Sequence, residues 1–84
     1  MNVESVSLLR LRVVAEADPA ALQRVLERFQ NLNVLPRRVI AEFGLSNTFH
    51  IRVDIAGLSE ERLSRIAAKI EQAPCVLSAY WSRG

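Results

Sequence analysis

The chain has 84 residues, half of them hydrophobic, with eleven basic and nine acidic side chains and a formal net charge of +2. This length fits a single domain, residues 1–84 with a core over about residues 6–83, and it excludes two domains. A domain this small buries only a small core, so we expect a second subunit to add to its stability.

The cysteine count and the N-terminal sequence bear on the cell compartment. Cys75 is the only cysteine, which excludes an internal disulfide and a zinc site of two to four thiolates. Residues 1–5 lack the basic start and long apolar core of a signal peptide, and the apolar stretches are too short to span a bilayer. We therefore expect a cytoplasmic protein with no membrane partner.

The first predicted element is a central strand over residues 6–16. Alternation places Leu9, Leu11 and Val13 on one of its faces. The other face carries Leu8, Arg10, Arg12 and Val14.

A helix is predicted to start at Asp18 and Pro19. Aspartate accepts hydrogen bonds from the free N–H groups of a first turn, and proline lacks the N–H that would be orphaned there. Asn33 suits a left-handed residue at the end of the helix, and Leu35-Pro36 cannot continue it. Helical spacing places on the buried side Leu22, Val25, Leu26, Phe29 and Leu32.

Two strands joined by a turn are predicted next. Residues 37–43 form the first, and Pro36 at its start is best tolerated at a sheet edge. Residues 44–47 supply the turn, and the second strand then alternates more clearly than any other segment. Its core face carries Phe49, Ile51, Val53 and Ile55, and its other face His50, Arg52 and Asp54.

A second helix is predicted after Ser59, which is a good N-cap. Glu60 and Glu61 follow in the first turn, where negative charge faces the positive end of the helix dipole. Pro74 ends this helix, and residues 76–82 form the last strand. The predicted core positions of the helix are Leu63, Ile66, Ala67 and Ile70.

The order of these elements predicts an α+β fold, the ferredoxin-like βαββαβ plait. Right-handed crossovers place both helices on one face of a four-stranded antiparallel sheet. The other face stays open and mixes apolar side chains with guanidinium groups, so it is either solvated or an interface. The candidate interface residues are Arg10, Arg12, His50 and Arg52.

The sequence offers no support for catalysis or metal binding. His50, the only histidine, lies in the middle of a strand, whereas Cys75 precedes the last strand, so the two do not form a nucleophile and base. His50 and Asp54 share a face but lie about 13 Å apart, too far to ligate one ion. Gly-rich phosphate loops and dinucleotide fingerprints are absent. We therefore expect no enzyme, no metal and no cofactor.

RNA binding is a less favoured function. RNA-recognition plaits stack bases on aromatic side chains of the open face, and we expect no aromatic residue there. The chain has ten arginines and one lysine, Lys69, but nine carboxylates weaken the overall field. The arginines are dispersed over helices, an edge and one sheet face, which favours a protein interface over a nucleic-acid partner.

Residues 17–29 resemble the start of ACT domains, small ligand-sensing plaits whose first turn approximates D/N-x-P-G-x-L-x-R-V, with a Phe later in the helix. The matching positions are Pro19, Leu22, Arg24, Val25 and Phe29. The order of elements extends this resemblance over residues 6–83. Within the family, the chain is most similar to the short form of the regulatory small subunit of acetolactate (acetohydroxyacid) synthase.

This resemblance implies a non-catalytic module of amino-acid metabolism. It would form a homodimer, bind a branched-chain amino acid between protomers and transmit feedback inhibition to a catalytic synthase subunit that uses thiamine diphosphate. Two positions depart from the family: Ala20 replaces the glycine beside the effector carboxylate, and Leu35 replaces an asparagine that holds the amino acid. Either the ligand is more apolar, or the domain acts by protein contact alone as a ligand-free dimerisation plait.

The candidate ligand site combines the helix start with a neighbour's strand. N–H groups at the first turn suit a carboxylate, although Asp18 competes for them and an ordinary capped helix has the same sequence. Arg37 and Arg38 would lie near a neighbour's turn in a family-like dimer, or they form a solvated edge. The candidate ligand-binding residues are Asp18, Pro19, Ala20, Ala21, Leu22, Leu35, Arg37 and Arg38.

Overall fold

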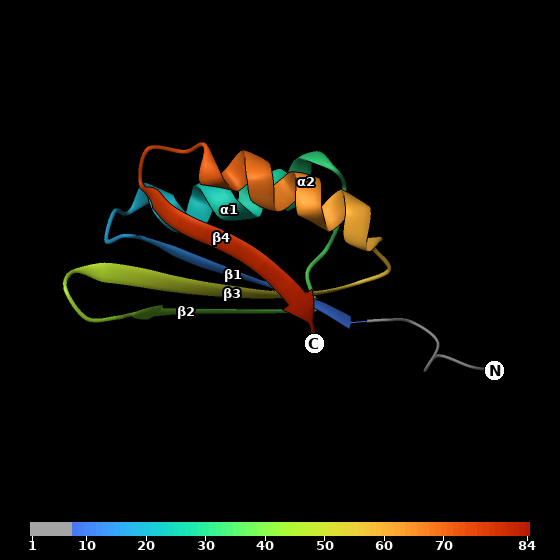
Figure 1. Cartoon of the computed structure of the whole chain (residues 1–84), viewed down its shortest axis with the longest axis horizontal. Coiled ribbons are helices and arrows are strands. Elements are labelled where there is room, and N and C mark those ends of the chain that lie inside the picture. The colour runs from blue at the N-terminus through green and yellow to red at the C-terminus, as the bar shows by residue number, and fades with distance from the viewer. Residues whose placement is uncertain (1–7) are drawn as a thin grey trace.

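Four antiparallel strands and two helices alternate in the order βαββαβ in the computed structural model, which describes residues 8–84. The sheet order is β2-β3-β1-β4. Both helices cover one face of this sheet, and the other face is open (Figure 1). The ferredoxin-like plait is thus confirmed, with β2 at one edge. The elements are β1 (Leu8–Glu16), α1 (Ala20–Asn31), β2 (Arg38–Phe43), β3 (Thr48–Ala56), α2 (Glu60–Glu71) and β4 (Val76–Arg83).

The core lies between the sheet and the two helices. The predicted alternation in the two central strands is confirmed: every second side chain of β1 is buried there, as are Ile51, Val53 and Ile55 of β3, and Phe49 is partly buried against them. Phe29 of α1 is the largest fully buried side chain, and Cys75 is buried in the same cluster. Residues 6 and 7 of the first predicted strand, and the N-terminal residues 1–5, lie outside the described part of the chain.

Helix α1 begins at the predicted place. The Asp18 carboxylate accepts a hydrogen bond from the Ala20 N–H (2.8 Å), and the Asp18 carbonyl accepts one from the Ala21 N–H (2.9 Å). Asn33 has a φ of 59°, which confirms the predicted left-handed residue. Leu32 was expected in the core but is 42% exposed, because it lies after the last helical residue, where φ is −95° and ψ is 5°. The buried positions of α1 are Ala21, Val25 and Phe29.

Helix α2 confirms its prediction more closely. The Ser59 hydroxyl accepts a hydrogen bond from the Arg62 N–H (3.1 Å), and Glu60 and Glu61 occupy the first turn. All four predicted core positions are buried, namely Leu63, Ile66, Ala67 and Ile70. No helix within residues 8–84 is both long enough and apolar enough to cross a membrane.

The turn between β2 and β3 has no glycine at its two central positions. Ser46 and Asn47 have φ values of 58° and 59°, and the Thr48 N–H donates to the Leu45 carbonyl (3.2 Å). Positive φ at both central residues is the geometry of a hairpin turn of type I′. A Cβ atom at Gly44 would lie 2.4 Å from Nε2 of His50, so a side chain there would force that exposed ring to move.

Candidate functional site

A small apolar hollow of ≈ 240 Å³ lies beside the turn between β1 and α1. It is smaller than the roughly 300–1,000 Å³ of pockets that hold drug-sized ligands, and it therefore suits a small molecule. The rings of Phe43 and Phe49 meet edge to face on one wall, with centroids 5.4 Å apart and an interplanar angle of 63°. The lining residues are Ala17, Asp18, Pro19, Leu22, Phe43 and Phe49.

The polar groups at this hollow favour a cation over an anion. Asp18 already accepts the hydrogen bond of the Ala20 N–H, so a ligand carboxylate would have to displace it. Ala21 is fully buried, and its N–H is bonded to the Asp18 carbonyl. The Asp18 carboxylate at the rim supplies a negative charge that an ammonium group can approach.

Three of the candidate ligand residues lie away from this hollow. Leu35 lines a second hollow, of ≈ 430 Å³, beyond the C-terminal end of α1. Arg37 donates its N–H to the Asp54 carbonyl (2.7 Å), and Arg38 pairs with Asp54 at the first position of β2. Phe43 is five residues further along β2, about 16 Å away. Within one chain, the candidate residues therefore form two groups at opposite ends of β2.

Exposed apolar side chains lie on β2 and in the loops just before and after it; we call this set the apolar strip of β2. Leu35, Phe43 and Leu45 are 87%, 78% and 88% exposed, and Val39 lies between them. The strand hydrogen-bonds to β3 on one side only, so its other backbone edge has no partner within the described residues. Exposed apolar side chains on an unpaired edge are typical of an interface.

The open face of the sheet carries a second cluster, centred on Asp54, which is only 8% exposed. Arg10 approaches it from β1 (Nε to Oδ1, 2.9 Å) and Arg52 from its own strand (Nη2 to Oδ2, 3.3 Å). Burial alone would raise the pKa of Asp54, but the hydrogen bonds and charges of Arg10 and Arg52 outweigh it and hold the pKa below its ordinary value.

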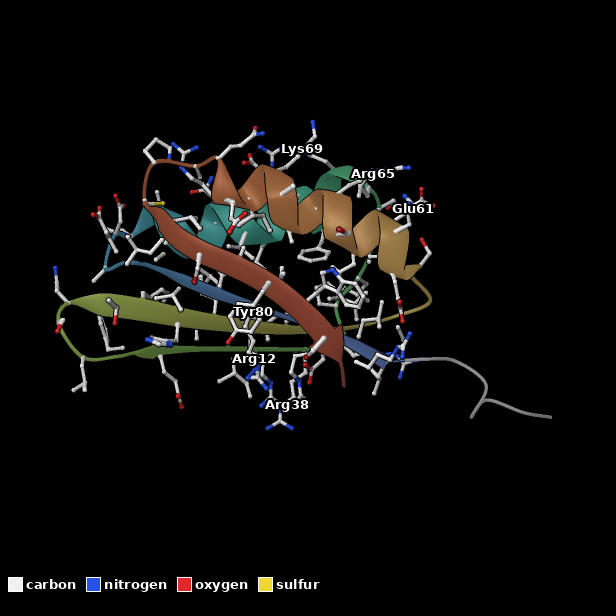
Figure 2. The ribbon with its side chains drawn as sticks, in the orientation of Figure 1. Arg12, Arg38, Glu61, Arg65, Lys69 and Tyr80 are labelled. Carbon is white, nitrogen blue, oxygen red and sulfur yellow. The ribbon has the colours of Figure 1, made fainter. Side chains whose placement is uncertain are left out.

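The open face also holds two residues that sequence reasoning did not place there. Tyr80 of β4 lies beside Arg12 in the register, which corrects the expectation that this face has no aromatic residue. Arg38, expected as a candidate ligand residue or as part of a solvated edge, lies beside Asp54 in the register. Figure 2 shows Arg12, Arg38 and Tyr80 on the side of the sheet away from the helices. Extending the alternation from buried Ala79 to its neighbour would have located Tyr80.

His50 is the remaining candidate interface residue. It is exposed near the turn, with Nε2 3.3 Å from the Thr48 hydroxyl, and lies opposite Glu42 in the register. Within residues 8–84, no three histidine, cysteine, aspartate or glutamate side chains gather where they could hold a metal ion.

Comparison with known proteins identifies the family. The model of an ACT-like domain matches residues 2–83, nearly the whole chain. The comparison with curated proteins found no match.

Solved structures share this fold at low sequence identity. The C-terminal domain of the MgtC protein from Mycobacterium tuberculosis superposes with a TM-score of 0.80 at 16% identity, covering 100% of this chain and 94% of that one. The ACT domain of GTP pyrophosphokinase from Chlorobium tepidum gives 0.75 at 13% identity, covering 92% and 99%. A homoserine dehydrogenase from Thiobacillus denitrificans gives 0.73 at 18% identity, covering 93% of this chain and 17% of that one. The match over residues 2–83, made by a chain that folds as the same plait, shows that this protein belongs to the ACT-like domain family.

Proposed function

We propose that this chain is a non-catalytic regulatory module that forms a homodimer along β2 and holds a small apolar amino acid between its protomers. The observation that carries this proposal is the apolar hollow at the end of β2, beside the start of α1. The exposed apolar side chains of β2 and of the loops at its two ends support the dimer.

Antiparallel pairing of two β2 strands would complete the site. In a two-fold dimer, the end of one β2 lies beside the start of the other. The hollow near Phe43 would then lie close to Leu35, Arg37 and Arg38 of the partner subunit. The two groups of candidate residues, which are separated within one chain, would form one site across the interface.

The chemistry of the hollow supports a branched-chain amino acid as the effector. Leu22, Phe43 and Phe49 offer apolar contacts to an aliphatic side chain. Asp18 would accept a hydrogen bond from the ammonium group, and the guanidinium of Arg37 of the partner subunit would pair with the carboxylate, whereas Arg38 faces the open side of the sheet, away from the hollow. This arrangement needs neither the glycine nor the asparagine that Ala20 and Leu35 replace.

The regulated partner to test first is the catalytic subunit of acetolactate synthase. This choice rests on the resemblance of the chain, within the ACT family, to the short form of the regulatory small subunit of that enzyme. An affinity-tagged copy of the chain should recover a thiamine-diphosphate synthase from cells that express both proteins.

Calorimetric titration tests the effector. Valine, leucine or isoleucine should release heat on binding, and Asp18→Asn, which keeps a helix-capping side chain, should weaken binding by about three- to thirtyfold because it removes the charge facing the ammonium. Glu27→Gln is the matched control, since it removes an exposed carboxylate from α1 outside the hollow. The control should bind like the wild-type chain.

Two results would contradict this proposal. Absence of heat with all three amino acids, together with a stable dimer, would show a ligand-free dimerisation plait. Equal weakening by Asp18→Asn and Glu27→Gln would show that net charge, and not this hollow, governs binding.

A further inference from the structure

The open face of the sheet carries Arg10, Arg12, Arg38 and Arg52 around the Asp54 carboxylate, and we call this set the arginine face. We propose that the arginine face binds an acidic, extended segment of a partner protein. The face lies on the opposite side of the sheet from the helices (Figures 1 and 2). It is distinct from the effector hollow, so the inference does not depend on the amino-acid site proposed above.

The register fixes how close these arginines are. Arg38, Asp54 and Arg10 lie side by side on β2, β3 and β1. Arg52 and Arg12 are direct cross-strand partners one step along the sheet. Side chains that face each other across neighbouring strands have Cβ atoms about 4.5–5.5 Å apart, and like charges in such pairs destabilise a sheet.

Among the described residues, few acceptors reach these guanidinium groups. Glu42 and Glu16 also lie on the open face, opposite His50 and Thr48, but neither forms an ion pair with these arginines. Both carboxylate oxygens of Asp54 are engaged by Arg10 and Arg52. Within residues 8–84, Arg12 and Arg38 form no ion pair, and Nε of Arg52 is buried without a hydrogen-bond partner. An anionic partner would supply the missing acceptors and relieve the repulsion between Arg12 and Arg52.

The spacing of the charges fits an extended acidic segment. Arg10 and Arg12 lie two residues apart on β1, about 7 Å, which is also the distance between alternate side chains of an extended peptide. A second copy of this chain does not fit, because face-to-face packing would set arginines against arginines.

The other side chains of the face favour a protein over a nucleic acid. Tyr80 lies beside Arg12, and Leu8, Val14 and Ile40 flank the charges. Tyrosine and arginine among apolar side chains are typical of protein interfaces. Single-stranded RNA is usually held by several stacking aromatic rings, and within residues 8–84 this face offers the Tyr80 ring and, near the turn, the imidazole of His50.

Fluorescence anisotropy tests this proposal with a labelled peptide of alternating Glu and Ser at low ionic strength. The full chain should bind it, and a peptide of alternating Gln and Ser should not bind. Arg12→Gln/Arg38→Gln should weaken binding by roughly three- to thirtyfold, the loss expected of two exposed ion pairs. The matched control is Arg28→Gln/Arg62→Gln, which removes the same charge from exposed positions in the helix layer. The control should keep wild-type affinity.

Asp54→Asn should change the affinity for the acidic peptide in the opposite direction. Removing the central carboxylate should tighten the binding of the acidic peptide, an effect that general loss of structure would not produce. The proposal is overturned by equal weakening in both double variants, by unchanged binding in Arg12→Gln/Arg38→Gln, or by no binding to the acidic peptide at all. Tighter, Arg12- and Arg38-dependent binding of an oligouridylate would assign the face to nucleic acid and also overturn it.

Discussion

At the scale of single residues, Asp54 stands out because its charge is almost completely buried. Its two arginine partners stabilise the ionised form, so its pKa in the folded chain is lower than in the unfolded chain. A carboxylate with a lowered pKa contributes stability above its unfolded pKa, about 3.9, and this contribution is lost as the pH falls through the folded value. Protonation of Asp54 in acid should therefore lower the unfolding free energy of the chain.

Asp54→Asn should lower the unfolding free energy at neutral pH by about 1–3 kcal/mol, since hydrogen bonds to a charged group are lost. Below about pH 4 the difference between this variant and the wild-type chain should shrink. Urea denaturation across the pH range measures both. A difference that stays constant into strong acid would show that Asp54 acts through its shape and not through its charge.

Phe29 tests the packing of the core at the same scale. Phe29→Ala should cost roughly 3–5 kcal/mol of unfolding free energy, because it removes the largest buried side chain. Phe29→Leu, which keeps most of the apolar volume, should cost less than about 1.5 kcal/mol. Thermal and urea denaturation compare the two. Similar losses in both variants would contradict close packing around this ring.

At the scale of elements, the sequence predicts what depends on local rules. Alternation in β1 and β3 identified the buried faces, and the Ser59 cap identified the start of α2. The prediction was wrong for Leu32, where helical spacing was extended past the last helical residue. It also missed Tyr80, although alternation within β4 from buried Ala79 places that ring on the open face; the register then sets it beside Arg12.

The candidate site also combines residues that local sequence predicts with residues that strand pairing brings in. The sequence identified Asp18, Pro19 and Leu22 at the hollow, because helix-start residues have a local signature. Phe43 and Phe49 complete its wall through the pairing of β2 with β3, which has no signature within either strand alone. Long-range pairing therefore accounts for most of what sequence reasoning missed.

Two sets of substitutions at the turn between β2 and β3 should change the unfolding free energy in opposite directions. Ser46→Asn/Asn47→Gly should raise stability by about 0.5–1 kcal/mol, because Asn-Gly suits positive φ at both positions better than Ser-Asn does. Gly44→Ala should lower it slightly, because the added Cβ displaces the exposed His50 ring from its contact with the Thr48 hydroxyl. Urea denaturation measures both variants. A stabilising Gly44→Ala would contradict the close approach of that ring.

At the scale of the whole molecule, two separate surfaces are available for binding: the β2 edge and the arginine face. The exposed apolar side chains of β2 and its flanking loops give the proposed dimer a surface. The arginine face lies on a different side, so dimerisation along β2 would leave that face accessible to another protein. The two surfaces predict a dimer with two equivalent docking faces.

Phe43→Lys should convert this dimer into a monomer, because it places a charge in the apolar strip of β2. The ring is mostly exposed in one chain, so the variant should fold and melt as a cooperative monomer. Leu77→Lys is the matched control, since it changes an exposed apolar side chain on β4, the other edge strand. Sedimentation equilibrium compares the masses of the three chains. A monomeric Leu77→Lys beside a dimeric Phe43→Lys would place the interface on β4, and the effector hollow would then lie within a single protomer and not between two.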